Sequence, residues 1–300
     1  MTAGLGGLFH IVAGVEVNPD FADEWRHQYP GATLYQADIR TLRPSEYPEF
    51  DLLIGGHSLH QPFNARAREE IAGWEGRTGD TGDLFLPVAH LIAECMPPAV
   101  VLENVPAFGT SLAGNLLVTH LIKLGCHVAT TILKPNIEWQ EIEDRPRWVL
   151  VTTLNRPFVI QPPGLPCMAP VTTHLDSPNP ELDRTDAERI APTIEGLRRH
   201  NARHRAAGHG FQFTTLDGGE LKVPTITKGH HKINNGPFVN TPFGPRLLRQ
   251  TEVERIHGCE LHTRHYATAV QMLGQGVQTR IFTRIFKQLA AHLLSDAPMP

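Results

Sequence analysis

The first half of the chain alternates short apolar runs with amphipathic stretches. Apolar runs that stop at glycine or polar residues predict strands, and apolar positions spaced three or four apart predict helices. The expected strands are Phe9–Glu16, Ala32–Ile39, Asp51–Gly56, Pro98–Asn104, Val128–Leu133 and Trp148–Thr153. The expected helices are Asp20–Tyr29, Leu84–Cys95 and Leu112–Leu124. This alternation indicates an α/β fold, a doubly wound and mostly parallel sheet with helices on both faces.

A proline-rich run, residues 156–180, interrupts the periodicity and marks the entry into a second, smaller domain. A basic helix over Asp186–Ala207 follows, and short strands and loops are expected within 210–213 and 221–232. The last two expected helices lie within Arg246–Gly258, where Thr251 is expected to cap the helix, and over Gln278–Leu294. We therefore expect a first domain over residues 1–156, a smaller domain over 157–245, and a segment, 246–300, that returns to the first domain.

The net charge of one region differs in sign from that of the whole chain. The formal charge of the 300 residues is −4, which by itself disfavours a nucleic-acid-binding protein. Between Arg184 and Arg264, however, thirteen lysines and arginines stand against eight acidic residues, a balance of +5 that leaves −9 for the rest. Such asymmetry is found in parts that face nucleic acid, although a mildly basic surface is also common in proteins that bind none.

The cysteines indicate a reduced environment. Cys95, Cys126, Cys167 and Cys259 are far apart and form no Cys-x-x-Cys pair, so the sequence indicates neither a zinc site nor a disulfide framework. No apolar run reaches the roughly 20 residues that span a membrane, and the first residues lack the pattern of a signal peptide. We expect a cytoplasmic protein that binds no membrane.

Two expected strands end in residues suited to chemistry. The run Asp51–Gly56 stops at two glycines and continues into a polar loop, residues 57–64. The run that begins at Pro98 ends with the carboxylate of Glu103, followed by Asn104 and a proline-stiffened turn. The carboxyl ends of parallel strands are the usual location of sites in open α/β sheets, so both ends are candidate site positions.

These strand ends resemble the core motifs of the DNA cytosine-5 methyltransferase family. That family has a strand–Gly–Gly–Pro-Cys-Gln loop and a Glu-Asn-Val motif; Leu102–Pro106 matches the second and Gln61–Asn64 matches the tail of the first. The nucleophilic cysteine is not matched. Counting forward from Asp51 places Leu59 at its position, and counting back from Gln61 places His60 there, so the loop is one residue longer. The resemblance implies a methyltransferase fold whose methylation step is severely impaired.

The resemblance also implies S-adenosyl-L-methionine as cofactor. The first glycines, Gly4, Gly6 and Gly7, match the loop on which the amino-acid end of the cofactor lies. Because the strand Phe9–Glu16 follows them at once, two interpretations stand: the family's first strand and helix are missing from this sequence, or the match is accidental.

Five further residues are implied as cofactor contacts. Glu16 is expected at the ribose hydroxyls, and Asp38 and Ile39 at the adenine. A helix cap for Glu16 and a plain turn for Asp38 are the alternative interpretations. Gln275 and Val277, in a glycine-containing segment before the last helix, are expected to close the pocket.

The catalytic residues implied by the resemblance are Glu103, Asn104, Arg147 and, at the position of the missing cysteine, His60. The sequence Arg145-Pro-Arg147 resembles the family's Arg-x-Arg motif, whose second arginine holds the O2 atom of the target base. Pairing of Arg147 with Glu141 or Glu143 is the alternative interpretation.

Double-stranded DNA is the implied partner, and the smaller domain is then a target-recognition domain. The candidates for phosphate contacts are Arg198, Arg199, Arg203, Arg205, Lys228 and Lys232. His230 and His231 resemble a metal-binding pair, but neighbouring side chains on a strand point apart and no carboxylate or cysteine is close in sequence. We therefore expect no metal.

Three hypotheses remain open from the sequence. The first is a DNA cytosine-5 methyltransferase by descent with little or no activity, acting as a monomer and associated with a restriction enzyme. The second is a catalytically inactive DNA-binding or regulatory homologue, such as a pseudoenzyme that partners an active methyltransferase. The third keeps the cofactor pocket but uses His60 as an acid or base in a modification that needs no thiol adduct.

Overall fold

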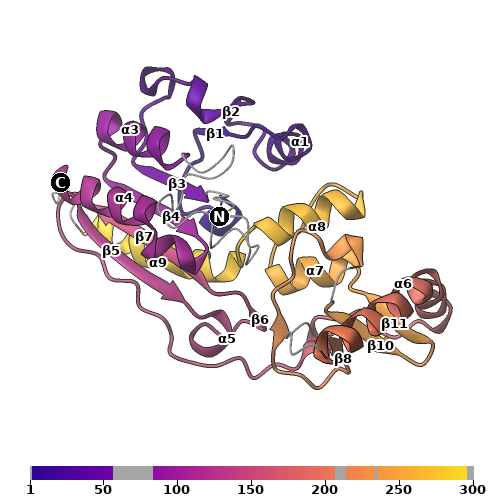
Figure 1. The fold of residues 1–300 in the computed structure, drawn as a ribbon. Coiled ribbons are helices and arrows are strands. Elements are labelled where there is room, and N and C mark those ends of the chain that lie inside the picture. The colour runs from indigo at the N-terminus through magenta and orange to yellow at the C-terminus, as the bar shows by residue number, and fades with distance from the viewer. Residues whose placement is uncertain (1, 57–83, 207–213, 234–235, 296–300) are drawn as a thin grey trace. The chain divides into compact units, whose positions relative to one another are not determined.

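A computed structural model describes residues 2–56, 84–206, 214–233 and 236–295. By their contacts the residues form two compact units (Figure 1). The first unit comprises Met1–Leu133, Pro146–Gln161 and Phe282–Pro300, and the second comprises Lys134–Arg145 and Pro162–Ile281. The expected three-part division stays a prediction about functional domains; the contacts place residues 246–281 in the second unit rather than in a return to the first.

The first unit contains mixed α/β structure. Two strands, β1 (Ala13–Val15) and β2 (Thr33–Tyr35), pair in parallel. A four-stranded sheet has the order β3-β4-β7-β5. Its strands are β3 (Leu52–Gly56), β4 (Ala99–Asn104), β5 (His127–Leu133) and β7 (Arg147–Thr153). In that sheet β3 and β4 are parallel, whereas β7 runs antiparallel to both β4 and β5. Among the described residues, no strand joins β1 to β3, so the expected single sheet is found as two pieces.

Local capping explains where the helices of this unit begin. Helix α1 (Pro19–Gln28) starts with proline at its first position, and the Asn18 side chain accepts hydrogen bonds from the next free backbone N–H groups. Helix α4 (Leu112–Lys123) is capped in the same way by the hydroxyl of Ser111. Helix α3 (Phe85–Cys95) supplies Val88 and Ile92 to the core, beside Leu117 and Leu121 of α4. Strand β4 is buried along its whole length, which fixes the position of its carboxyl end.

The second unit is built from short elements and three longer helices. Its strands are β6 (Glu143–Asp144), β8 (Thr215–Leu216), β9 (Val223–Pro224), β10 (Phe238–Thr241) and β11 (Gly244–Leu247). Its helices are α5 (Pro135–Glu138), α6 (Pro180–Ala206), α7 (Gln250–His257) and α8 (Tyr266–Gln275). Helix α9 (Thr279–Leu294) begins in this unit and belongs to the first unit from Phe282 onward. None of the helices in the described part of the chain is both long enough and apolar enough to cross a bilayer.

Three details of this unit differ from the sequence prediction. Helix α6 begins at Pro180, six residues before the expected start, because Asn179 caps it through its side chain and acidic residues fill its first turn. Helix α8 was not expected, and the segment Leu273–Gln275 forms its last turn instead of opening the final helix. The expected cap Thr251 lies inside α7; Arg249 occupies the cap position and its N–H donates to the Glu252 carboxylate.

A buried arginine ties the end of α8 to the rest of the second unit. The guanidinium of Arg145 donates to the backbone oxygens of Gly274, Gly276 and Ile226, at 2.7, 3.1 and 2.9 Å. The backbones approach so closely here that a Cβ on Gly274 would lie 2.4 Å from the backbone nitrogen of Lys228. Glycine is therefore required at position 274 by packing and not by its dihedral angles, since the residue is helical.

Substitution of Gly274 tests this close approach. Helix propensity alone favours alanine in α8, but the clash with the Thr227–Lys228 backbone opposes it. We expect Gly274→Ala to lower the free energy of unfolding by at least about 2 kcal/mol in urea denaturation. The matched control is Gly219→Ala, where a Cβ would meet no atom within 4 Å; its effect should stay within about 0.5 kcal/mol. Equal effects of the two substitutions would contradict the packing.

Candidate functional site

Glu103 and Arg147 form an ion pair at one end of the four-stranded sheet. Glu103 is the penultimate residue of β4 and Arg147 the first residue of β7, so antiparallel pairing brings the two together. The Nε atom of Arg147 lies 2.7 Å from Oε1 of Glu103, and the two side chains are only 14% and 8% exposed. The alternative pairing of Arg147 with Glu141 or Glu143 is not found; Glu141 binds Arg280, and Glu143 lies beside Arg145.

Asn104 fixes the turn that follows this pair. Its side chain is buried, and its Oδ1 atom accepts a hydrogen bond of 2.8 Å from the N–H of Val105. The amide oxygen thus stiffens the chain at the exit from β4. The packing of Trp148 against Phe108, with ring centroids 5.2 Å apart, holds the same turn from the β7 side.

The loop expected to carry the nucleophile starts from the same edge of the sheet. Strand β3 ends at Gly56, which pairs with Glu103 in the parallel ladder. Because Gly56 is the last residue of β3, the chain leaves this strand next to the Glu103 carboxylate. Leu59 and His60 themselves lie outside the described residues, so the role of His60 stays a prediction.

The thiols of the first unit lie at the opposite edge of the sheet. Cys126 precedes β5, whose first residue His127 pairs with Thr153, and Thr153 in turn pairs with Ala99 at the start of β4. Cys95 ends α3, just before the same strand start. Glu103 lies four positions after Ala99 along β4, a distance of about 13 Å. Burial raises the pKa of both thiols, which disfavours the reactive thiolate.

The residues expected to hold the cofactor's sugar and base lie at the carboxyl ends of β1 and β2. The parallel register pairs Val15 with Tyr35, so Glu16 and the segment leading to Asp38 leave the sheet at one edge. Glu16 Oε1 accepts a 2.7 Å hydrogen bond from the N–H of Asn18, which matches the capping interpretation as well as a ribose contact. Gly6 and Gly7 have φ of 54° and 76°, values that favour glycine, and Gly4 is buried in a short 3-10 helix.

Asp38 is engaged by a neighbouring arginine. Its carboxylate caps the turn Ile39–Thr41 and accepts hydrogen bonds from the backbone and the guanidinium of Arg40, which lower the pKa of Asp38. An adenine amine would share this carboxylate with Arg40. Ile39 packs in part against the hydrophobic core beside α3, so only one side of it remains for a ring.

Gln275 and Val277 belong to the second unit, and their cofactor contacts stay predictions. Val277 is buried, and the backbone around it is held by Arg145. The sequence analysis missed this arginine and the buried carboxylate beside it, Glu143, whose oxygens accept from Ile226 N–H and from the Gln278 side chain. The Arg-Pro-Arg sequence at a strand start was the available signal. It does not show that Arg145 belongs to the second unit and Arg147 to the first.

The candidates for phosphate contacts lie on two elements of the second unit. Arg198, Arg199, Arg203 and Arg205 are exposed on the last turns of α6, and Lys228 and Lys232 are exposed around a 3-10 turn, His230–Lys232. That turn corrects the expectation of a strand at the histidine pair. His230 points into the protein, where burial lowers its pKa to about 4, whereas His231 is half-buried. In the described part of the chain, no three His, Cys, Asp or Glu side chains gather in a way that would hold a metal.

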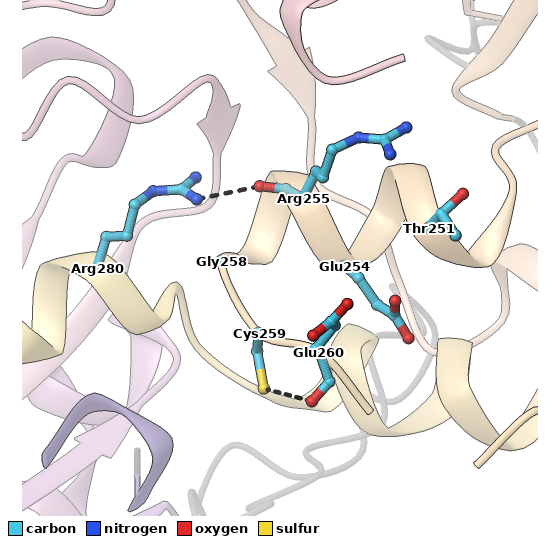
Figure 2. Close-up of a pocket in the computed structure, with 7 residues that line it drawn as sticks. All are labelled: Thr251, Glu254, Arg255, Gly258, Cys259, Glu260 and Arg280. Atoms are coloured by element: carbon cyan, nitrogen blue, oxygen red, sulfur yellow. Dashed lines mark hydrogen bonds between the residues drawn. The ribbon is translucent and has the colours of Figure 1, made fainter. Parts of the chain in front are cut away.

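A surface pocket in the second unit is unrelated to the candidate site. It encloses about 340 Å³ and is lined by residues of α7, the turn after it and the start of α9, as Figure 2 shows. Arg280 is bound to Glu141 and to the backbone oxygen of Arg255, and Arg255 is paired with Asp176. None of the expected catalytic, cofactor or DNA contacts lines this pocket.

The family of the chain follows from its match to known proteins. The family model for C-5 cytosine-specific DNA methylases matches residues 1–291. The chain belongs to this family. Members of the family use S-adenosylmethionine as methyl donor and act on cytosine in DNA. The methylase match spans both units and includes the Glu103 and Arg147 motifs.

Two curated relatives are type II methyltransferases. The chain is 26% identical to M.HpaII of Haemophilus parainfluenzae over 275 residues, covering 84% of this chain and 73% of the relative. It is also 26% identical to M.DsaV of Dactylococcopsis salina over 231 residues, covering 74% of this chain. The match spans 62% of M.DsaV, which is less than two thirds of that protein.

Solved structures confirm the fold class. The Dnmt2 methyltransferase of S. pombe superposes with a TM-score of 0.74 at 16% identity, covering 98% of this chain and 95% of that one. The DNMT2 of Spodoptera frugiperda gives a TM-score of 0.72 at 15% identity, with coverages of 96% and 95%. The chain thus has the mixed α/β fold of S-adenosylmethionine-dependent methyltransferases.

The Glu103–Arg147 pair should also be measurable as a contribution to stability. Arg147→Met leaves the Glu103 carboxylate without this partner in a mostly buried position, so we expect a loss of about 3 kcal/mol in urea denaturation. Adding Glu103→Gln should restore part of that loss, since no charge is then left behind. Asp23→Ala, which breaks the exposed pair of Asp23 with Arg26, is the control and should cost less than about 1 kcal/mol. A loss for Arg147→Met no larger than the control would contradict the buried pairing.

Proposed function

We propose that this chain binds S-adenosylmethionine and double-stranded DNA, holds a cytosine turned out of the duplex, and methylates it slowly or not at all. The observation that carries the proposal is the combination of an intact Glu103–Arg147 pair with the absence of any cysteine at that edge of the first unit. The fold and the family indicate the class of reaction. These residues determine how much methyl-transfer activity remains.

The ion pair suits the Watson–Crick edge of cytosine. In the proposed complex the Glu103 carboxyl group holds a proton between itself and N3, and the Arg147 guanidinium donates to O2. Arg147 currently donates through Nε to Glu103 and through Nη1 to the Pro146 oxygen. A guanidinium has five N–H donors in a fixed fork, so one group can donate to several acceptors at once. Burial of the pair excludes water and strengthens both contacts to the base.

The first unit fits the cofactor at three places. When bound, S-adenosylmethionine supplies an electrophilic sulfonium methyl group. Glu16 follows β1 at the position where an acidic residue binds ribose hydroxyls in nucleotide-type folds. The Gly6–Gly7 backbone has room for close approach, because nothing lies within 4 Å of a Cβ at Gly7. Asp38, with its lowered pKa, stays an anionic acceptor for an amine.

The missing group is the nucleophile. C5 of cytosine attacks a methyl group only after a nucleophile adds to C6 and generates an enamine, with proton transfer at N3. A cysteine thiolate is soft and partly ionised near neutrality, and neither leucine nor imidazole replaces it in this role. Loss of a covalent nucleophile normally lowers the rate by several powers of ten.

A second function is favoured by the same absence. A protein that keeps the base-holding pair without the nucleophile would act as a DNA-binding or regulatory homologue, alone or beside an active methyltransferase or a restriction enzyme. The exposed arginines of α6 and the lysines near His230 are then the expected phosphate contacts, and the monomer binds DNA through the second unit. The use of His60 as an acid or base in another modification has no comparable support from the described residues.

Transfer of labelled methyl from S-adenosylmethionine to cytosine-containing duplex DNA tests the proposal. We compare the unaltered chain with Leu59→Cys and His60→Cys, and use Ser58→Cys as the control for a thiol elsewhere in the loop. One of the first two variants should transfer label at least about a thousandfold faster than the unaltered chain, because only the nucleophile is restored. The control should remain inactive.

The outcomes separate the two functions. Rapid labelling by the unaltered chain would contradict the proposal, since another group would then perform the attack. If no variant labels DNA, binding of the cofactor and of DNA is measured next. A rise in Tm with S-adenosylmethionine, together with DNA binding, supports the regulatory homologue. Failure to bind either ligand overturns both functions.

A further inference from the structure

Two histidines converge on the surface of helix α6 in the second unit. His200 and His204 are one helical turn apart, the spacing that places side chains on the same face. Their Nε2 atoms are 3.0 Å from each other, and their ring centroids 4.2 Å. His200 is exposed and His204 half-buried, so the paired nitrogens lie at the border of solvent.

The geometry is close to that of a chelate. Two imidazole nitrogens bound to one tetrahedral zinc ion, each at about 2.0–2.1 Å, are about 3.3 Å apart. The observed separation differs from this by only a few tenths of an ångström, which a small rotation of either side chain supplies. At 3.0 Å, at least one ring is neutral, with one nitrogen donating its proton to the other. A metal ion would replace that shared proton.

We propose that His200 and His204 form a chelating site for a borderline divalent transition-metal cation such as Zn²⁺, Ni²⁺ or Cu²⁺. Imidazole nitrogen suits these ions, whereas Mg²⁺ and Ca²⁺ prefer oxygen ligands. Water fills the remaining coordination positions, because the described residues place no third histidine, cysteine or carboxylate with the pair. The proposal does not depend on methyl transfer or on cofactor binding.

The charges around the pair determine how metal binding depends on ionic strength. Arg199 and Arg203 lie on the neighbouring stripe of α6 and repel any cation, so an ion held by charge alone would not collect here. The carboxyl end of the helix offsets part of this repulsion, since its partial negative charge favours cations in the last turns. Added salt screens the exposed arginines. Binding by coordination should therefore be as strong or stronger at high ionic strength, the opposite of electrostatic binding.

The ion would also act on the helix itself. A bridge between positions one turn apart holds the backbone of residues 200–204 in helical geometry, near the end of α6, where helices otherwise fray. Ligation requires the unprotonated nitrogen of each imidazole. Occupancy should thus slow amide exchange in the last turns of α6 at about pH 8.

Calorimetric titration of the full chain with NiCl₂, and separately with MgCl₂, tests the site. His200→Ala and His204→Ala should each weaken Ni²⁺ binding by at least about tenfold, because even the loss of an outer-shell partner of a metal ligand costs about 10–100-fold. The matched variant is His204→Ala combined with Arg205→His, which keeps the number of histidines but moves one off the shared face. The control is His127→Ala, which removes an exposed histidine of β5. Alanine is a good helix former, and an unchanged Tm without metal verifies folding.

The expected result is one Ni²⁺ bound by the unaltered chain and by the control, with at least tenfold weaker binding by the other three variants and none for Mg²⁺. In the presence of Ni²⁺, amide exchange of residues 199–206 should slow only in the variants that still bind the ion. Absence of binding by the unaltered chain overturns the proposal. Equal affinity in the moved-histidine variant, or an equal loss in the control, overturns it as well.

Discussion

The hydrogen-bonded ion pair between Glu103 and Arg147 is the interaction on which the candidate site depends. It exists because β4 and β7 run antiparallel in the centre of a buried sheet, with Glu103 opposite Val149 and Arg147 just beyond the last pair. The same register places Gly56 beside Glu103, so the loop that follows β3 leaves from this edge. A shift of one residue in either ladder would turn the carboxylate to the other face of the sheet.

The register also places the two thiols of the first unit far from Glu103. Cys95 and Cys126 are fixed at the far edge, where α3 and α4 deliver the chain back to the sheet, and their burial disfavours the thiolate. Movement of either to Glu103 would require disruption of the core that positions Glu103. The Glu103–Arg147 pair can therefore be present without a cysteine in the loop after β3, because the pair depends only on the pairing of β4 with β7.

Much of this arrangement was predictable from the sequence. The remainder was not predictable, for physical reasons. Periodicity located β3, β4 and β7 and the helices α1, α3 and α4, since each has a clear apolar pattern and a local stop signal. The family motifs named Glu103 and Arg147 as residues of one site, but their ion pair was not predicted, because Glu141 and Glu143 are closer to Arg147 in sequence. The role of Arg145 could not be found, because it depends on backbone carbonyls more than 80 residues away. The requirement for Gly274 could not be found either, because it depends on close approach to the backbone of Lys228, 46 residues away. The start of α6 was placed late, since its first turn is polar and shows no apolar stripe.

The most direct test of the central claim is mass spectrometry of the chain after incubation with S-adenosylmethionine and duplex DNA containing 5-fluorocytosine. A thiol that adds to C6 stays covalently attached once C5 is methylated, because fluorine cannot leave as the proton does. The account predicts no adduct on the unaltered chain, and an adduct on the introduced cysteine of the active loop variant. An adduct on Cys95, Cys126, Cys167 or Cys259 of the unaltered chain would contradict it.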